Sequence, residues 1–239
     1  MAQNHFSLDT DKRDLVKEKK EREASTANII ERISELPAAA ISDVQRNLQA
    51  AYVMDARIRN MVPGSRVVGI AFTALARAGS IITVHKALLE APPGSVIVVG
   101  GGEMLQQPNG ALFGKLMATQ AKLRGILGIV ADGAVRDIAD LRDLRFPTFA
   151  RCATPHVGMN RTVGETQVPV PCGGLIVNPG DYVLGDEDGV VVIPADMVEQ
   201  VVSDAEERLR KEQDYLKRMQ AGECLGDLVG FRKLIYPNK

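Results

Sequence analysis

Residues 125–140 have the sequence GILGIVADGAVRDIAD, an apolar run followed by a polar segment. The run at 126–131 is short, rich in β-branched residues and preceded by glycine, which predicts a buried strand. Asp132 and Gly133 predict a turn directly after it, and residues 138–144 have the pattern of a helix. This order predicts a layered α/β fold, in which ligands bind outside the carboxyl ends of the strands.

The same alternation continues on both sides of this stretch. Further strands are predicted at 66–75, 95–99, 147–152, 182–184 and 190–193, and further helices at 26–36, 41–50, 83–89 and 111–123. No internal repeat interrupts the series. The sequence therefore predicts one α/β domain over residues 25–195.

The composition excludes several classes of protein. The 239 residues are 45% hydrophobic and 25% charged, with a net charge of −1, which excludes a disordered chain, collagen and a disulfide scaffold. Because 29 basic residues balance 30 acidic ones, neither nucleic acid nor a membrane surface is expected as a partner. The cysteines form no Cys-x-x-Cys pair, and neither a signal peptide nor a membrane-spanning run is evident. We expect a cytoplasmic protein that binds a small molecule or another protein.

Charge is concentrated near the two ends of the chain. Residues 9–23 (DTDKRDLVKEKKERE) and 204–218 (DAEERLRKEQDYLKR) are too charged to form a core by themselves. They predict a charged N-terminal arm over residues 1–24, and a C-terminal helix and tail over residues 196–239.

The predicted C-terminal helix has a carboxylate on its apolar face. The apolar stripe consists of Val198, Val202, Ala205, Leu209, Leu216 and Met219. Glu212 occupies the position that continues the spacing between 209 and 216. Either it is a tolerated charge near the end of a solvated helix, or this face docks against a site that needs a carboxylate. The spacing leaves both interpretations open.

Two short segments could bind a ligand. Arg136 offers planar donors for a carboxylate or an enolate oxygen, and Asp137 offers a hard oxygen ligand for Mg²⁺ or Mn²⁺. The alternative is an acidic residue at a helix N-terminus beside a surface arginine. Residues 108–117, which contain Gly110 and Gly114, form a glycine-opened turn into another predicted helix, whose first amides could bind an anion, although a plain loop-to-helix connection has the same pattern.

Longer motifs support the first interpretation. Residues 114–137 (GKLMATQAKLRGILGIVADGAVRD), together with FP at 146–147, PCGG at 171–174, PGD at 179–181 and DEDGVVVIP at 186–194, resemble the RraA-like family. That family joins the regulator of ribonuclease E activity to class II pyruvate aldolases, which cleave 4-hydroxy-4-methyl-2-oxoglutarate and 4-carboxy-4-hydroxy-2-oxoadipate. The resemblance implies an α-β-β-α sandwich, assembled as a homotrimer or homohexamer with sites between subunits.

The resemblance also implies roles for individual residues. Asp137 would ligate Mg²⁺ or Mn²⁺, and Arg136 would hold the pyruvyl oxygen and offset enolate charge. The backbone amides of Leu116 and Met117, which follow Gly114, would bind the substrate carboxylate. Aldolase-type members have a long C-terminal helix that packs on a neighbouring subunit, with a glutamate that reaches the neighbour's metal through water. Glu212 matches that position.

Two positions depart from the family pattern. Lys115 stands where the aldolases have an aspartate, and Ala78-Gly79-Ser80 stands where many members have Pro-Gly-Asp. An ammonium in place of a carboxylate changes the charge near the metal by two units. Lys115 could pair with a second substrate carboxylate, act as an acid/base group if desolvated, or form a Schiff base.

The sequence therefore predicts a divalent-metal-dependent lyase acting on a 2-oxo acid. Either retro-aldol cleavage of a 4-hydroxy-2-oxo acid or decarboxylation of oxaloacetate would leave the same pyruvate enolate. The alternatives are a non-catalytic RraA-like regulator that binds a protein partner, and an isomerase or dehydratase that uses the same enolate chemistry.

Overall fold

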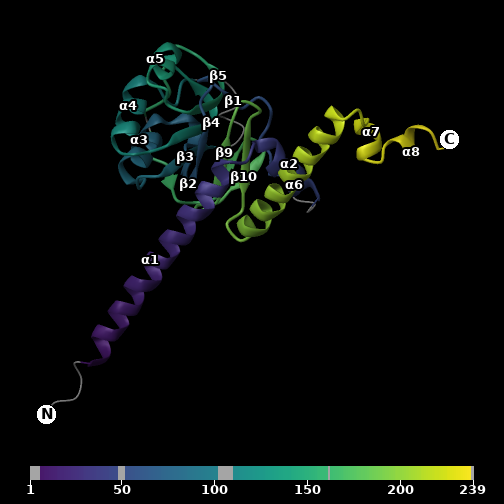
Figure 1. The fold of residues 1–239 in the computed structure, drawn as a ribbon. Helices are drawn as coiled ribbons and strands as arrows, with labels where there is room; N and C mark the ends of the chain where they lie inside the picture. Colours follow the sequence, from purple (N-terminus) through teal and green to yellow (C-terminus); the bar gives the residue numbers. More distant parts are fainter. Residues whose placement is uncertain (1–5, 48–51, 102–109, 161, 238–239) are drawn as a thin grey trace.

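The computed structural model describes residues 6–47, 52–101, 110–160 and 162–237 (Figure 1). The helices are α1 (Phe6–Ser34), α2 (Ala38–Asn47), α3 (Ile81–Glu90), α4 (Lys115–Leu123), α5 (Ile138–Asp143), α6 (Val198–Gln220), α7 (Leu225–Leu228) and α8 (Arg232–Ile235), with a 3₁₀ turn at Arg77–Gly79. The strands are β1 (Arg59–Asn60), β2 (Val67–Leu75), β3 (Ser95–Gly100), β4 (Gly128–Val135), β5 (Thr148–Ala153), β6 (Glu165–Thr166), β7 (Val170–Cys172), β8 (Leu175–Val177), β9 (Tyr182–Gly185) and β10 (Val190–Ile193).

The strands form one large sheet and a separate hairpin. The large sheet has the order β1-β5-β4-β3-β2-β9-β10, and β6 also pairs with β2. Strands β2, β3, β4 and β5 are parallel neighbours, whereas β9, β10 and β1 run antiparallel to the strands that they join. Strands β7 and β8 pair only with each other. The carboxyl ends of β3, β4 and β5 therefore lie at one edge of the sheet, as the sequence predicts for a ligand site.

Three apolar cores separate four layers, because alternate residues of each strand enter different cores. In the first core, Ile97 and Ile129 pack against α3, α4 and α5. Val98 and Val130 belong to a second core, in the interior of the sheet. That interior also contains residues of β7, β8, β9 and β10. Leu184 of β9 belongs to the third core, against α1, α2 and α6. This layering confirms the predicted α-β-β-α sandwich.

The predicted strands and helices are present, with differences of extent and one wrong turn. Helix α4 begins at Lys115 rather than at 111, because Ala111 bridges to Ala134 and Val157. Helix α1 is longer than predicted and begins at Phe6. The turn predicted at Asp132 is wrong: β4 continues to Val135, with a register shift between Ala131 and Ala134. Of the helix predicted at 41–50, residues 48–50 lie outside the described part of the chain.

The terminal helices meet at the end of the sheet formed by β9 and β10. The last turns of α1 enter the core at Ile33, whereas its first turns project away from the body of the molecule (Figure 1). Arg32 links α1 to α6 through ion pairs with Glu206 at 2.8 Å and Glu199 at 3.0 Å. Among the described residues, no helix is long and apolar enough to span a membrane.

The apolar stripe of α6 is covered over only part of its length. Val198, Val202 and Ala205 are buried against α1, α2 and β10. Leu216 and Met219, further along the same stripe, are 57% and 39% exposed. The second half of α6 therefore presents an apolar face that the described residues leave partly exposed.

Candidate functional site

The carboxyl end of β4 and the start of α5 bring Arg136 and Asp137 to the sheet edge. Asp137 precedes α5 in the left-handed backbone conformation (φ 57°), which a residue other than glycine rarely adopts. Nε of Arg136 lies 3.6 Å from Oδ2 of Asp137. The backbone N–H of Arg136 donates to the carbonyl oxygen of Phe113 at 2.9 Å, which ties this turn to the segment before α4.

Gly114 allows the two segments to approach closely. A Cβ atom at this position would lie 2.6 Å from Oδ2 of Asp137 and 2.9 Å from Cγ of Arg136. The backbone of Gly114 is extended (φ −164°), so the requirement is for space rather than for an unusual conformation. Glycine at 114 thus lets the N-terminus of α4 reach the carboxylate of Asp137.

The N-terminus of α4 presents amide donors beside this carboxylate. The N–H of Lys115 donates to Oδ2 of Asp137 at 2.9 Å, and the N–H of Ala118 is bonded to the carbonyl oxygen of Gly114. The N–H groups of Leu116 and Met117 have no acceptor among the described residues. Free amides at the positive end of a helix bind anions such as carboxylates.

Lys115 is bound to a second acidic residue of α5. Its Nζ lies 2.6 Å from Oδ1 of Asp140, and the two side chains are 54% and 40% exposed. The hydrogen bond that Lys115 donates to Asp140, aided by the charges of Asp140 and Asp137, raises the pKa of Lys115 above its ordinary value. The amine is therefore protonated at neutral pH, a state that favours pairing with an anion over action as a base or Schiff-base nucleophile.

A hollow lies beside Arg136 and Asp137. Its volume is about 310 Å³, and its other wall is formed by residues that follow β5, Thr154 and Pro155 among them. This volume is at the lower end of the range for small-molecule sites. The structure thus brings together Arg136, Asp137, Gly114, Lys115 and the amides of Leu116 and Met117, while their roles stay predictions.

The described residues offer a single candidate carboxylate for a metal ion at this position. They contain no cluster of three or more histidine, cysteine, aspartate or glutamate side chains that could hold a metal ion. Asp137 offers one carboxylate, and its Oδ1 has no hydrogen-bond donor among the described residues. Mg²⁺ keeps several waters and commonly uses one or two carboxylates, so this donor fits such an ion in composition.

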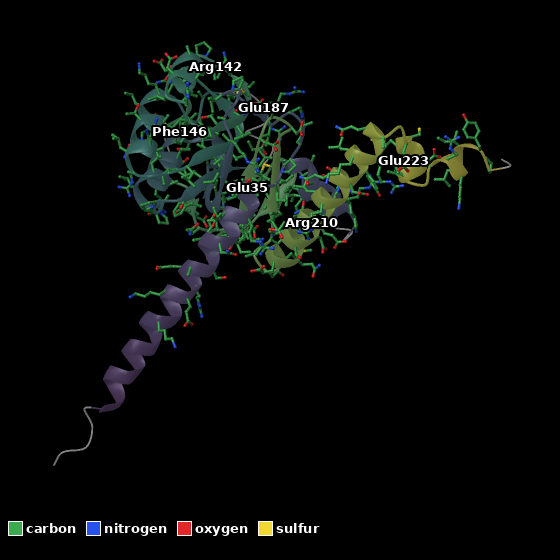
Figure 2. All side chains as sticks on the ribbon, in the orientation of Figure 1. Glu35, Arg142, Phe146, Glu187, Arg210 and Glu223 are labelled. Atoms are coloured by element: carbon green, nitrogen blue, oxygen red, sulfur yellow. The ribbon has the colours of Figure 1, made fainter. Side chains whose placement is uncertain are left out.

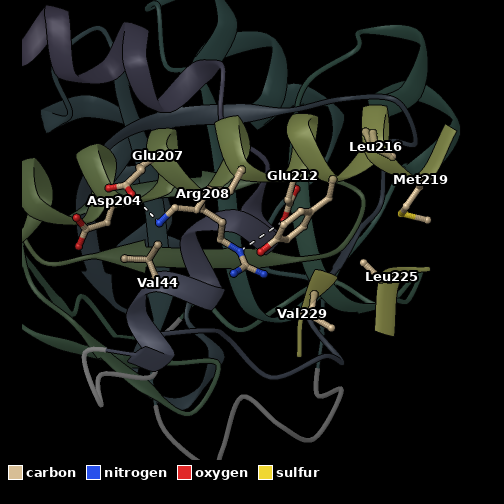
Figure 3. A pocket seen from close by; sticks show the side chains of 11 residues that line it. Val44, Asp204, Glu207, Arg208, Glu212, Leu216, Met219, Leu225 and Val229 are labelled. Atoms are coloured by element: carbon tan, nitrogen blue, oxygen red, sulfur yellow. Dashed lines mark ion pairs between the residues drawn. The ribbon is translucent and has the colours of Figure 1, made fainter. Parts of the chain in front are cut away.

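Glu212 is not brought to this site within one chain. It lies on α6, which packs near β10, whereas α5 lies over the other end of the sheet (Figure 1). Oε1 of Glu212 is 3.5 Å from Nε of Arg208, and both residues line a groove of about 800 Å³ (Figure 3). The apolar wall of that groove includes Leu216 and Met219, the uncovered part of the α6 stripe.

A buried ion-pair network behind the site was not predicted from the sequence. Nε of Arg151 donates to Oδ1 of Asp132, and the two side chains are 8% and 4% exposed. The other oxygen of Asp132 accepts the N–H of Gly173 at 2.9 Å, and Arg151 also reaches Asp55 at 3.4 Å. The only sequence signal is an arginine within the apolar strand pattern of 147–152. Cys172, next to this network, has a raised pKa because it is buried, so it is not a reactive thiolate.

Comparisons with known proteins agree with this fold. The family model RraA-like: Aldolase/RraA matches residues 38–192. A protein of Halalkalibacterium halodurans, provisionally named a 4-hydroxy-4-methyl-2-oxoglutarate aldolase, is 33% identical over 204 residues, which cover 85% of this chain and 93% of that protein. The 4-hydroxy-4-methyl-2-oxoglutarate aldolase of Thermus thermophilus is 39% identical over 111 residues, which cover 46% of this chain and 66% of that protein.

A solved structure points to the other branch of the same family. The Streptomyces coelicolor protein described as an unusual member of the RNase ES inhibitor RraA protein family has a TM-score of 0.70 and 26% identity. The match covers 80% of this chain and 98% of that one. Because the family model spans well over half of the residues and the layers match, the chain belongs to the RraA-like (Aldolase/RraA) family.

Proposed function

We propose that this protein is a divalent-metal-dependent lyase that cleaves a carbon–carbon bond in a 2-oxo acid. The observation that carries the proposal is the convergence of Arg136, Asp137 and the free amides of Leu116 and Met117 at one sheet edge. The aldolase names of similar proteins support the same reaction class.

Each group has a role that its chemistry suits. The amides of Leu116 and Met117 bind the carboxylate of the 2-oxo acid, and the guanidinium of Arg136 donates to the 2-oxo oxygen. When the bond between C3 and C4 breaks, electrons move to this oxygen, and the positive charge of Arg136 stabilises the resulting enolate. In retro-aldol cleavage the 4-hydroxyl group loses its proton to water and C4 becomes a carbonyl carbon, whereas oxaloacetate releases C4 as CO₂. Both reactions leave this enolate, which takes a proton from water at C3 to become pyruvate, so the same groups serve either reaction.

Asp137 is the residue that would hold Mg²⁺ or Mn²⁺ in this chain. Such an ion would supply Lewis-acid polarisation of the 2-oxo group. Because the described residues offer no complete ligand set, we infer that Glu212 of a second copy contributes through water. The uncovered α6 face would pack on that copy in a homotrimer or homohexamer, and residues 196–239 would form the arm that reaches it.

The proposal is tested by turnover. Purified protein, stripped of metal and then supplied with Mg²⁺ or Mn²⁺, is incubated with 4-hydroxy-4-methyl-2-oxoglutarate, 4-carboxy-4-hydroxy-2-oxoadipate or oxaloacetate. Pyruvate release, measured by a coupled assay, is expected with at least one substrate and only with added metal. Absence of pyruvate with all three substrates, with either ion, would contradict the proposal.

Lys115 is expected to select substrates that have a second carboxylate. Replacing it by methionine removes the ammonium at the mouth of the site but keeps the length of the side chain. We expect KM for a dicarboxylic 2-oxo substrate to rise about tenfold, because loss of one charge-assisted hydrogen bond weakens binding by about that factor. The value of kcat should change less. Lys122→Met, on the far end of α4, is the matched control. If Lys115→Met instead lowers kcat and leaves KM unchanged, Lys115 is an acid/base group rather than a binding residue.

Substitution of Gly114 by alanine is expected to damage the site without unfolding the protein. The added methyl group would overlap Oδ2 of Asp137, so the carboxylate and Arg136 must shift. We expect kcat/KM to fall by about 100-fold, since displacement of about 1 Å has that effect on positioned groups. Thermal unfolding should change little, because Gly114 has an ordinary extended backbone. Gly226→Ala, where a Cβ meets open space, is the control.

A second function is favoured by one observation, the similarity to a structure described as an RNase ES inhibitor-family member. In that case the protein would bind a ribonuclease through its surface and would have no turnover. The distinguishing assay is ribonuclease E activity with and without the purified chain. Inhibition that persists in Arg136→Ala, together with absent pyruvate release, would replace the lyase proposal by this one.

A further inference from the structure

A second cavity lies at the opposite end of α5 from Asp137. It has a volume of about 710 Å³ and is lined by the loop that precedes β2, by Arg142 in the last turn of α5, and by Arg145 just beyond it. Arg66, at the end of the loop, completes the wall. Three arginine side chains thus line one hollow, in a volume typical of small-molecule sites.

None of these arginines is neutralised by a carboxylate in the described part of the chain. By contrast, Arg136, Arg151 and Arg208 each pair with an acidic side chain. Arg66 donates instead to the carbonyl oxygens of Ile33 and Leu36, and Nε of Arg142 donates to that of Met61 at 3.2 Å. These bonds hold the two guanidinium groups in place while their remaining N–H groups stay available for an acceptor.

Hydrogen bonds hold the loop beside them. Nδ2 of Asn60 donates to the carbonyl oxygen of Ser65 at 2.9 Å, and Oδ1 of Asn60 accepts the N–H of Val62 at 3.0 Å. The carboxylate of Glu187 accepts hydrogen bonds from the N–H of Gly64 and from Nδ2 of Asn60. Glu187 therefore binds the loop, and it forms no ion pair with the three arginines among the described residues. Figure 2 labels Arg142 and Glu187 on this side of the molecule. The wall of the cavity is thus organised before any ligand binds.

Arg145 provides an independent indication. It lies after the end of α5 in the left-handed conformation (φ 49°), where glycine is the favoured residue. Its guanidinium has no hydrogen-bond acceptor among the described residues, so no contact in that part of the chain explains an arginine there. A strained position that holds a cation at a cavity suggests a role in binding.

We propose that this cavity binds a small, multiply charged oxyanion, with a diphosphate or a polycarboxylate as its charged part. Arginine binds both groups through paired N–H donors, and three arginines without counter-ions match a ligand with two or more negative charges. The cavity lies at the N-terminal ends of β2 and β5, so it is separate from the candidate lyase site at the carboxyl ends of β4 and β5.

The test is calorimetric titration of metal-free protein with inorganic pyrophosphate and, separately, with citrate. Saturable binding of one ion per chain is expected for at least one of them. Saturation by pyrophosphate alone assigns a phosphate ligand, and saturation by citrate alone assigns a polycarboxylate. Absence of saturable binding for both would overturn the proposal.

Arg145→Gly separates binding from folding. Glycine relieves the left-handed strain, so the melting temperature should stay the same or rise, while affinity for the anion falls by about tenfold or more. Arg142→Gln should weaken binding similarly. Arg124→Gln is the matched control, because Arg124 is also exposed and bound only to a carbonyl oxygen, that of Leu89. Equal loss in Arg124→Gln, or loss in Arg136→Gln with none in Arg145→Gly, would overturn the assignment to this cavity.

Discussion

Replacement of Asp137 by asparagine is expected to lower pyruvate release by more than about 100-fold. Loss of a residue that only supports a metal ligand lowers activity by up to about 100-fold, and loss of the ligand itself should have a larger effect. Asparagine also adopts the left-handed conformation and can still accept the N–H of Lys115 through its amide oxygen. The fold should therefore persist, with a melting temperature close to that of the parent chain. Kinetics across a Mg²⁺ titration measure the effect, and the apparent metal affinity should fall as well.

The control for this variant is Asp143→Asn. Asp143 is an exposed carboxylate on the same helix, and its loss should leave turnover unchanged. Full activity in Asp137→Asn would remove the metal-ligand role.

Mixing Asp137→Asn with Glu212→Gln subunits tests the shared site. If the two residues meet between copies, mixed oligomers contain some intact sites and recover part of the activity. If Glu212→Gln alone keeps full activity, this carboxylate is the solvated charge of the simpler interpretation.

Replacement of Arg151 by methionine is expected to lower the free energy of unfolding by about 3–5 kcal/mol, the usual effect of removing one partner of a buried ion pair. Methionine fills a similar volume, so little of the loss comes from a cavity. Asp132 would remain buried with its charge, bound only to the N–H of Gly173. Urea-induced unfolding at equilibrium measures the change.

Arg57→Met is the matched control for Arg151→Met. Arg57 pairs with the same Asp55 but its side chain is 67% exposed, so its removal should change stability far less than removal of Arg151. The double variant Asp132→Asn with Arg151→Met should recover part of the loss, because the unpaired buried charge is then absent. A loss no larger than that of Arg57→Met would show that Arg151 is not required to neutralise Asp132.

Local patterns explain how much of the fold could be predicted. Runs such as 95–99 and 190–193 are β-branched and apolar because they are buried on both sides, and such runs become strands in any layered fold. Residues 114–117 and 136–137 could be placed at the carboxyl ends of strands because the strand-to-helix order fixes that edge. The role of Glu212 stays a prediction, since its partner is expected in another copy.

The sequence by itself determined the layers, the order of the strands and helices, and the edge at which Arg136, Asp137 and the α4 amides meet. Only the tertiary structure decided which contacts form between polar residues that are distant along the chain. Asp132-Gly133 has the local pattern of a turn, yet β4 continues through it because Arg151 and the N–H of Gly173 satisfy the carboxylate inside the fold. The cluster of Arg66, Arg142 and Arg145 is likewise invisible in the sequence, because residues 66 and 142–145 become neighbours only when the sheet places the starts of β2 and β5 on one side.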